Sequence, residues 1–100
     1  MADVVWTYGA SEDLQKIFEF LENGRSGAGV DFMMNTDARL QLVKLFPRMN
    51  RFYLPPFRKL RLMGNFGLFY IIESRGIVVH AVADLRQDPS SLRRRLFGED

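Results

Sequence analysis

With 100 residues, 47% of them hydrophobic and 13% aromatic, the chain can bury one compact core, so we expect one domain over residues 1–100. The absence of cysteine excludes disulfides, a thiolate nucleophile and a cysteine-ligated metal. No apolar run approaches the roughly 18 residues that span a bilayer, so we expect a soluble cytoplasmic protein without a membrane contact. The formal net charge of +2 is uninformative by itself.

The first two predicted elements are a short strand and an amphipathic helix. Residues 4–6 (VVW) are β-branched or aromatic, which favours a pleated surface. A helix is expected to begin at Ser11, with Glu12 and Asp13 in its first turn, where the helix dipole favours anions. Its apolar positions recur at intervals of three and four residues and are Leu14, Ile17, Phe18 and Leu21.

A glycine-rich segment, residues 23–29 (NGRSGAG), separates this helix from a second one. It lacks a final Gly-Lys-Ser/Thr and follows a helix rather than a strand, which favours an interhelical turn over a phosphate-binding loop. The second helix is expected over residues 30–46, and the two should form an antiparallel hairpin. Its apolar period, and hence its expected buried face, runs through Met34, Ala38, Leu42 and Leu45.

Charge is distributed unevenly between the two halves of the chain. Residues 1–46 hold four Lys/Arg against seven Asp/Glu, whereas residues 47–100 hold ten against five. Five of the later cations occur without an intervening acid and are Arg48, Arg51, Arg58, Lys59 and Arg61. This pattern is typical of a surface for a polyanion or an acidic protein partner, and equally of a solvated face.

After the prolines at 47, 55 and 56 the period changes to two, which predicts three strands. Leu60 and Leu62 alternate with Lys59 and Arg61, so the first strand has an apolar and a cationic face. Turns at residues 64–65 and 74–76 separate it from two further apolar runs, FGLFYII and IVVHAVA. Asp88-Pro89 then predicts the N-cap and first residue of a short basic helix.

These elements together predict the fold class. The order strand, two helices, three strands and short helix is typical of an α+β sandwich, in which the helical hairpin covers one face of a small, largely antiparallel sheet. The face that carries Lys59 and Arg61 has nothing obvious left to cover it.

Side chains for nucleophilic or metal chemistry are scarce. His80 is the only histidine, and the acidic residues are scattered rather than set at ligand spacing, so we expect neither a metal site nor a cofactor. His80 itself is expected to be a half-buried strand residue bonded to a backbone group, rather than a general acid or base.

Cations on the predicted sheet are a second candidate for chemistry. Lys59 and Arg61 share one strand face, and Arg86 follows the last strand at an end that could approach them. Cations around a phosphodiester could stabilise the charge that develops when a ribose 2′-OH attacks it, so these three are the candidate catalytic residues of an endoribonuclease. The alternative is a solvated face, or one neutralised by an acidic partner.

Aromatic residues interleave with these cations, as they do in nucleic-acid stacking surfaces. We expect Phe52 and Tyr53, in a loop beside prolines, to be exposed or to pack against a partner, whereas Tyr70 lies mid-strand and should belong to the core. The expected partner-binding residues are Arg48, Arg51, Phe52, Tyr53, Arg58, Lys59, Arg61 and Arg86.

Three motifs occur in order along nearly the whole chain. They are Ala10-Ser11-Glu12-Asp13-Leu14 with Ile17, then Leu60-Arg61 followed by Gly64-Asn65-Phe66-Gly67-Leu68-Phe69-Tyr70, and finally Arg86-Gln87-Asp88-Pro89 with Leu92. This ordered set resembles the RelE/ParE toxin superfamily. The resemblance implies an N-terminal strand, a helical hairpin, a three-stranded antiparallel meander and a short C-terminal helix. It also implies a type II toxin, held in a hetero-oligomer by a small antitoxin whose C-terminal segment wraps it.

The sequence departs from the patterns of the superfamily at three places. Gly67 stands where an arginine often precedes the next strand, Ala83 stands where ParE-like chains often carry a histidine, and no tyrosine follows Tyr70. The set of residues expected of a RelE-like nuclease is therefore incomplete, which favours a ParE-like plasmid stabilisation toxin that binds and inhibits a target such as DNA gyrase. The alternatives are a RelE-like nuclease that cleaves mRNA on the ribosome, and an inactive binding module of the same fold.

Overall fold

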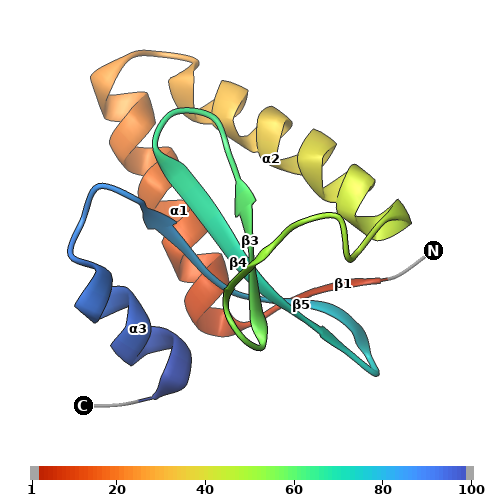
Figure 1. Cartoon of the computed structure of the whole chain (residues 1–100). Helices are drawn as coiled ribbons and strands as arrows, with labels where there is room; N and C mark the ends of the chain where they lie inside the picture. Colours follow the sequence, from red (N-terminus) through yellow and green to blue (C-terminus); the bar gives the residue numbers. More distant parts are fainter. Residues whose placement is uncertain (1–2, 99–100) are drawn as a thin grey trace.

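The chain folds into a five-stranded sheet with a helical hairpin packed along it (Figure 1). The computed structural model describes residues 3–98. Its elements are β1 (Val4–Trp6), α1 (Tyr8–Gly24), α2 (Ala28–Leu45), β2 (Phe52–Leu54), β3 (Phe57–Arg61), β4 (Phe66–Glu73), β5 (Gly76–Asp84) and α3 (Pro89–Phe97). The strand order is β1-β5-β4-β3-β2, with β1 parallel to β5 and the other neighbours antiparallel. The predicted α+β arrangement is confirmed, with β2 as an added edge strand.

Helix α1 begins earlier than the sequence pattern predicts. Thr7 is its N-cap, because the Thr7 hydroxyl accepts a hydrogen bond from the Ala10 amide at 3.1 Å, so the expectation of Ser11 at this position was wrong. The predicted apolar face of α1 is otherwise confirmed, since Leu14, Ile17 and Leu21 pack against the core.

Helix α2 turns a different face to the sheet from the one that its sequence suggests. Its buried residues are Gly29, Phe32, Thr36, Leu40 and Val43. Thr36 is satisfied within the helix, because its hydroxyl donates to the Phe32 carbonyl at 2.9 Å. Ala38 is exposed, as are Met34, Leu42 and Leu45, so the expected buried face was wrong.

The turn between the two helices is organised around the carboxylate of Glu22. This carboxylate accepts hydrogen bonds from the amides of Gly27, Gly29 and Val30, at 3.2, 2.8 and 3.2 Å. The Gly27 amide bond is the main cause that lowers the pKa of Glu22, and the other two amides add to it. The predicted interhelical turn is therefore confirmed, and a side chain of α1 takes the place that an anion would have at the start of α2.

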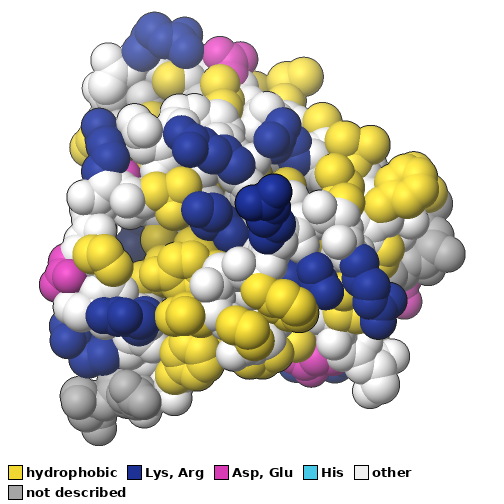
Figure 2. Space-filling model, viewed as in Figure 1, with side chains coloured by type: hydrophobic (Ala, Val, Ile, Leu, Met, Phe, Trp, Pro, Cys, Tyr) yellow, Lys and Arg dark blue, Asp and Glu magenta, His cyan; other side chains and the backbone are white. Residues whose placement is uncertain are grey.

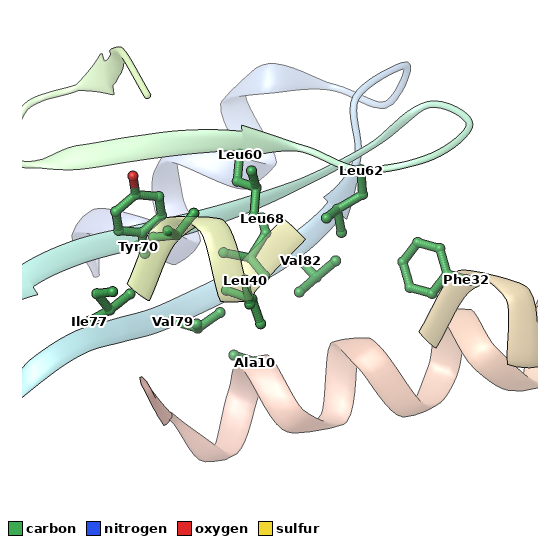
Figure 3. Packing of buried hydrophobic residues seen from close by; sticks show 11 residues of the cluster. Ala10, Phe32, Leu40, Leu60, Leu62, Leu68, Tyr70, Ile77, Val79 and Val82 are labelled. Carbon is green, nitrogen blue, oxygen red and sulfur yellow. The ribbon is translucent and has the colours of Figure 1, made fainter. Parts of the chain in front are cut away.

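The core lies between the hairpin and one face of the sheet (Figure 3). Leu60, Leu68 and Val79 come from the strands and point toward Leu40 of α2, whereas the Tyr70 hydroxyl is turned away from Leu40. Leu60 and Leu62 are only 3% exposed, which confirms the alternation predicted for β3. Consequently Lys59 and Arg61 lie on the opposite face of the sheet, called the outer face below.

Helix α3 covers part of this outer face, contrary to the expectation that nothing would. Asp88 is its N-cap and Pro89 its first residue, as predicted, and the Asp88 carboxylate accepts from the Ser90 amide at 3.0 Å. The Phe97 ring meets Phe57 of β3 edge-on, with ring centroids 5.1 Å apart.

Within residues 3–98, no helix is both long and apolar enough to cross a membrane.

Candidate functional site

An apolar stripe runs along the solvent side of α2. It is formed by Val30, Met34, Leu42 and Leu45 and continues into Phe46 and Met49 after the helix, and we call it the α2 stripe. Met34 is 66% and Leu45 55% exposed, although each would be expected to avoid water. At 100° per residue the mean directions of the α2 stripe and of the buried face differ by roughly 180°. The helix is therefore apolar on two opposite sides, only one of which is covered by the chain itself.

Basic side chains lie beside the α2 stripe on the same face of the molecule. Figure 2 shows hydrophobic side chains along α2, Lys and Arg side chains over the middle of this face, and Asp and Glu only near its margins. Arg48 and Arg51, in the connection between α2 and β2, are exposed, and so is Phe52. Among the described residues, neither Arg48 nor Arg51 forms an ion pair. The predicted basic loop is thus available to a partner.

Arg58 has a structural role within this loop. Its guanidinium donates to the Asn50 carbonyl at 2.7 Å and lies 4.0 Å from the centroid of the Phe52 ring. Arg58 thereby fixes the loop against β3 and holds Phe52 in place. Among the contacts of residues 3–98, Arg58 is the one expected partner-binding residue whose charged group already binds both a backbone carbonyl and an aromatic ring.

The buried Tyr70 holds the same loop against the sheet through hydrogen bonds of its hydroxyl. Its hydroxyl donates to the Pro47 carbonyl at 2.7 Å and accepts from the Asn50 side chain at 3.3 Å. Burial raises the pKa of Tyr70, because the phenolate would lose its solvation. Tyr70 is therefore a neutral, fully bonded core residue, as its position in the sequence predicts, and it joins the end of α2 to the centre of the sheet.

On the outer face, Lys59 and Tyr53 line a cavity of about 310 Å³ between β5 and α3. Tyr53 is half-buried and packs edge-on against Phe69, with ring centroids 5.0 Å apart. Lys59 forms no ion pair with any acidic residue in the described part of the chain. Arg61 does not line this cavity, and its carbonyl accepts a hydrogen bond from the Arg39 side chain of α2.

Arg86, the third candidate for catalysis, is neutralised by a neighbour. Its guanidinium donates to both carboxylate oxygens of Asp84, at 3.1 and 2.9 Å, and its amide donates to the same carboxylate at 2.9 Å. These bonds lower the pKa of Asp84 and raise the pKa of Arg86. Arg86 is not among the residues that line the Lys59 cavity. Arg86 thus lies outside the cavity, although the Asp84 that binds it is one of the lining residues.

Gly67 leaves a notch in β4 that the Leu85 side chain fills. A Cβ at position 67 would lie 2.8 Å from a Leu85 methyl group, so a larger residue requires Leu85 to move.

His80 is half-buried as predicted, but the expectation that it bonds a backbone group was wrong. Its ring nitrogen lies 3.2 Å from the Glu73 carboxylate, and the ring packs edge-on against Phe57. Within residues 3–98, His, Asp and Glu form no cluster that could hold a metal ion.

The comparisons with known proteins agree with this architecture. The family model described as the ParE toxin of the type II toxin–antitoxin system, parDE, matches residues 4–89. A solved structure from the chromosomal ParDE TA system of P. aeruginosa superposes with a TM-score of 0.72 at 14% identity, and the match covers 85% of this chain and 97% of that chain. That likeness shows the same fold, whereas no curated protein matches the chain. The chain therefore belongs to the family of ParE toxins of type II toxin–antitoxin systems.

Proposed function

We propose that this ParE-family protein is neutralised by a cognate antitoxin that covers the α2 stripe and the basic loop beside it. The observation that carries the proposal is the exposure of the whole stripe, from Val30 to Met49, on one side of a helix whose other side is buried. A contiguous exposed apolar patch marks an interaction site in a protein of this size. Covering it would remove the stripe from water and create a stable hetero-oligomer.

The charges next to the stripe indicate what kind of segment fits it. Arg48 and Arg51 flank its C-terminal end, and acidic residues are scarce on this face (Figure 2). An amphipathic helix with one apolar side and acidic flanks would match both features, since apolar contacts supply affinity and complementary charges speed association. Lys59 and Arg61 lie on the outer face of the sheet, so an antitoxin that also contacts them must extend from the stripe to that face.

Binding to the antitoxin can be tested with the protein encoded next to this gene. We expect the double variant M34A/L45A to bind it at least about tenfold more weakly, because two exposed anchors are lost. Isothermal titration calorimetry gives the affinity. The matched control is F20A, which removes a side chain that is 70% exposed on α1, away from the stripe. Equal affinity of M34A/L45A and the parent would place the antitoxin elsewhere.

The basic loop calls for a separate variant, because charge acts mainly on association. R48E/R51E should slow association with the antitoxin, and the difference from the parent should shrink as salt is raised. Stopped-flow measurements at two ionic strengths check this expectation. A change confined to the dissociation rate would argue against a steering role for the loop.

We further propose that the toxin acts in the cytoplasm by binding and inhibiting a target such as DNA gyrase, as in plasmid stabilisation modules. Two features support binding over phosphodiester cleavage. Leu85 fills the notch at Gly67, where a nuclease of this superfamily often has an arginine. Asp84 neutralises Arg86, and Arg95, which lines the Lys59 cavity, pairs with Asp13, so among the described residues the Lys59 ammonium has no free guanidinium beside it.

The target is tested by inducing the protein with and without its antitoxin. We expect arrested growth, loss of negative supercoiling in a reporter plasmid and a DNA-damage response, with each effect suppressed by the antitoxin. Plasmid topology on chloroquine gels and primer extension on abundant messages are read from the same culture. Cleaved messages with normal supercoiling would reverse this assignment, and unaffected growth would indicate the inactive binding module.

The alternative function, an mRNA endoribonuclease, has one observation in its favour. Lys59 is free of acidic partners in the described chain and shares a cavity with the Tyr53 ring, a pairing of cation and aromatic that suits a nucleotide. Under this alternative, alanine at Lys59, Arg61 and Arg86 together would abolish mRNA cleavage while circular dichroism stays unchanged. Cleavage that survives the triple substitution would remove these residues from the site.

A further inference from the structure

The charged side chains on the solvent side of α2 change sign along the helix. Asp31 and Asp37 lie in its first part, Lys44 lies in its last turn, and Arg48 follows soon after the helix ends. Lys44 is half-buried and the other three are exposed. The α2 stripe runs past all of them, and Figure 2 shows its hydrophobic side chains along the helix. One apolar surface therefore has an acidic end and a basic end.

Asp37 and Lys44 find no opposite charge within their own helix. Side chains on a helix surface meet at spacings of three and four residues. At these spacings Asp37 has no basic neighbour and Lys44 has no acidic one. Within residues 3–98 neither side chain forms an ion pair, whereas Asp31 pairs with Arg25 at 3.2 Å. The carboxylate of Asp37 and the ammonium of Lys44 are thus available to another molecule.

These two charges lie on the same flank of the α2 stripe. They are seven residues apart, so they point in nearly the same direction and lie about 10 Å apart along the helix axis. Asp37 is about 60° from Met34 around the helix, which places both charges beside the stripe rather than within it. A twofold axis perpendicular to two antiparallel helices keeps each flank on its own side of the interface. In such a pair, Asp37 of one copy lies beside Lys44 of the other, and the contact occurs twice.

The same arrangement brings the apolar residues of two copies together. Asp37 and Lys44 are three and four positions from Leu40, so the twofold axis passes near the level of Leu40. Met34 and Leu45 are six and five positions from that level, and Ala38 is two, so Met34 of one copy meets Leu45 of the other across small Ala38 side chains. A parallel pair would instead place Asp37 beside Asp37, which repels. Only the antiparallel pair matches both the apolar residues and the charges.

We propose that the α2 stripe, when no antitoxin covers it, binds the α2 stripe of a second copy of this chain in an antiparallel, twofold arrangement flanked by two Asp37–Lys44 pairs. The stripe has six apolar residues per copy, whereas a stable interface uses about 20–30 residues per side. The dimer is therefore weak, with a dissociation constant on the order of 10–100 µM. The proposal depends on the exposed stripe and not on the antitoxin, but an antitoxin that covers the stripe would displace the second copy.

Analytical ultracentrifugation of charge variants tests this pairing. The parent should be monomeric at about 1 µM and mostly dimeric at about 300 µM. D37K places Lys beside Lys, and K44D places Asp beside Asp, so each alone should weaken the dimer about tenfold. An equimolar mixture of D37K and K44D should dimerise like the parent, because every contact between the two variants again joins Lys to Asp.

The matched controls are E19K and K16D, which make charge changes of the same size on exposed residues of α1. Both should dimerise like the parent, and circular dichroism checks that all variants keep their helices. A parent that stays monomeric at about 300 µM would overturn the proposal. So would a dimer that D37K and K44D leave unchanged, or a mixture that restores nothing.

The absence of cysteine from the chain allows a second readout by disulfide cross-linking. Gln41 is exposed, lies seven residues after Met34 and therefore faces the same way, one position from the level of the proposed axis. Q41C should form a disulfide between two copies under mild oxidation, and D37K/Q41C should form it more slowly. The control is Q15C, on an exposed position of α1. Equal cross-linking of Q41C and Q15C would contradict the antiparallel α2 interface.

The same cross-link separates this proposal from that of the antitoxin site. Saturating Q41C with the antitoxin should suppress the disulfide, because both partners need the stripe. A disulfide that still forms with the antitoxin bound would retain the dimer interface and move the antitoxin elsewhere. A monomeric parent that binds the antitoxin through the stripe would remove the dimer and retain the antitoxin site.

Discussion

Phe32 and Met34 lie two residues apart on α2, yet Phe32 is fully buried and Met34 is 66% exposed. The inward side of the helix packs on the sheet through Phe32, Leu40 and Val43, and the outward side carries the α2 stripe. Both sides are apolar, so hydrophobicity alone does not decide which one faces the core. The shape of the helix surface decides which side is buried. Gly29 lies on the inward side, and the lack of a side chain there lets α2 approach α1 closely.

The most direct test of the difference between the two sides of α2 is to truncate one residue on each side and compare the losses in unfolding free energy. F32A should lower the free energy of unfolding by about 3–5 kcal/mol, because it empties a buried site where Phe32 meets Phe66 with centroids 5.2 Å apart. M34A should stay within about 0.5 kcal/mol of the parent. Urea denaturation measures both. Equal losses would mean that the two sides of α2 contribute alike to the monomer.

A second change sharpens the reason why the inward side is chosen. In G29A the new methyl group would lie 2.8 Å from the Phe18 carbonyl and 2.7 Å from a Glu22 methylene. Forcing the helices apart should lower the unfolding free energy by roughly 1–3 kcal/mol. Thermal denaturation followed by circular dichroism tests this, with the exposed G24A as control, since nothing lies near its new methyl group. Indifference to G29A would remove close approach as the explanation.

The next change addresses the link between the end of α2 and the sheet. Y70F deletes the hydroxyl that bonds Pro47 and Asn50, which should cost about 1 kcal/mol and loosen the loop that carries Arg48 and Arg51. Urea denaturation gives the energy, and hydrogen exchange at residues 47–54 reports the loop. An unchanged loop with lowered stability would show that Tyr70 supports only the core.

The smallest expected effect concerns the start of α2. The folded pKa of Glu22 lies below its ordinary value of 4.5, so the charged carboxylate stabilises the fold above that pH and this contribution is lost as pH falls through the folded pKa. E22Q should therefore be less stable than the parent at pH 6, and the gap should narrow toward pH 3. Denaturation at several pH values checks the trend. A gap independent of pH would assign the role of Glu22 to hydrogen-bond geometry rather than charge.

Much of the fold follows from sequence patterns that act locally. Alternation in β3 correctly assigns Leu60 and Lys59 to opposite faces, and Asp88 with Pro89 correctly starts α3. The apolar period of α2 predicts the wrong buried face, because the face that is actually buried contains Thr36, whose hydroxyl bonds the carbonyl of Phe32 in the same helix. The exposed α2 stripe has the more regular apolar spacing, so periodicity favours it.

The candidate site was predicted less completely, because its features depend on distant contacts. Docking of α3 depends on Arg95 meeting Asp13, 82 residues earlier, and no local pattern reveals that pair. Asp84 and Arg86 are only two residues apart, but many acidic and basic residues at this spacing do not pair, so the spacing alone does not predict the ion pair. The sequence shows an apolar period through Met34, Leu42 and Leu45, but only the fold shows that this side of α2 is exposed.

The notch at Gly67 has a mechanical consequence for the C-terminal end of the chain. Leu85 fills the notch and its amide donates to the Asn65 carbonyl, so the chain is pinned immediately after β5. Leu85 therefore fixes the point at which the chain leaves the sheet, only a few residues before α3 begins at Pro89. A larger residue at position 67 would displace Leu85 and thus shift the start of the segment that leads to α3.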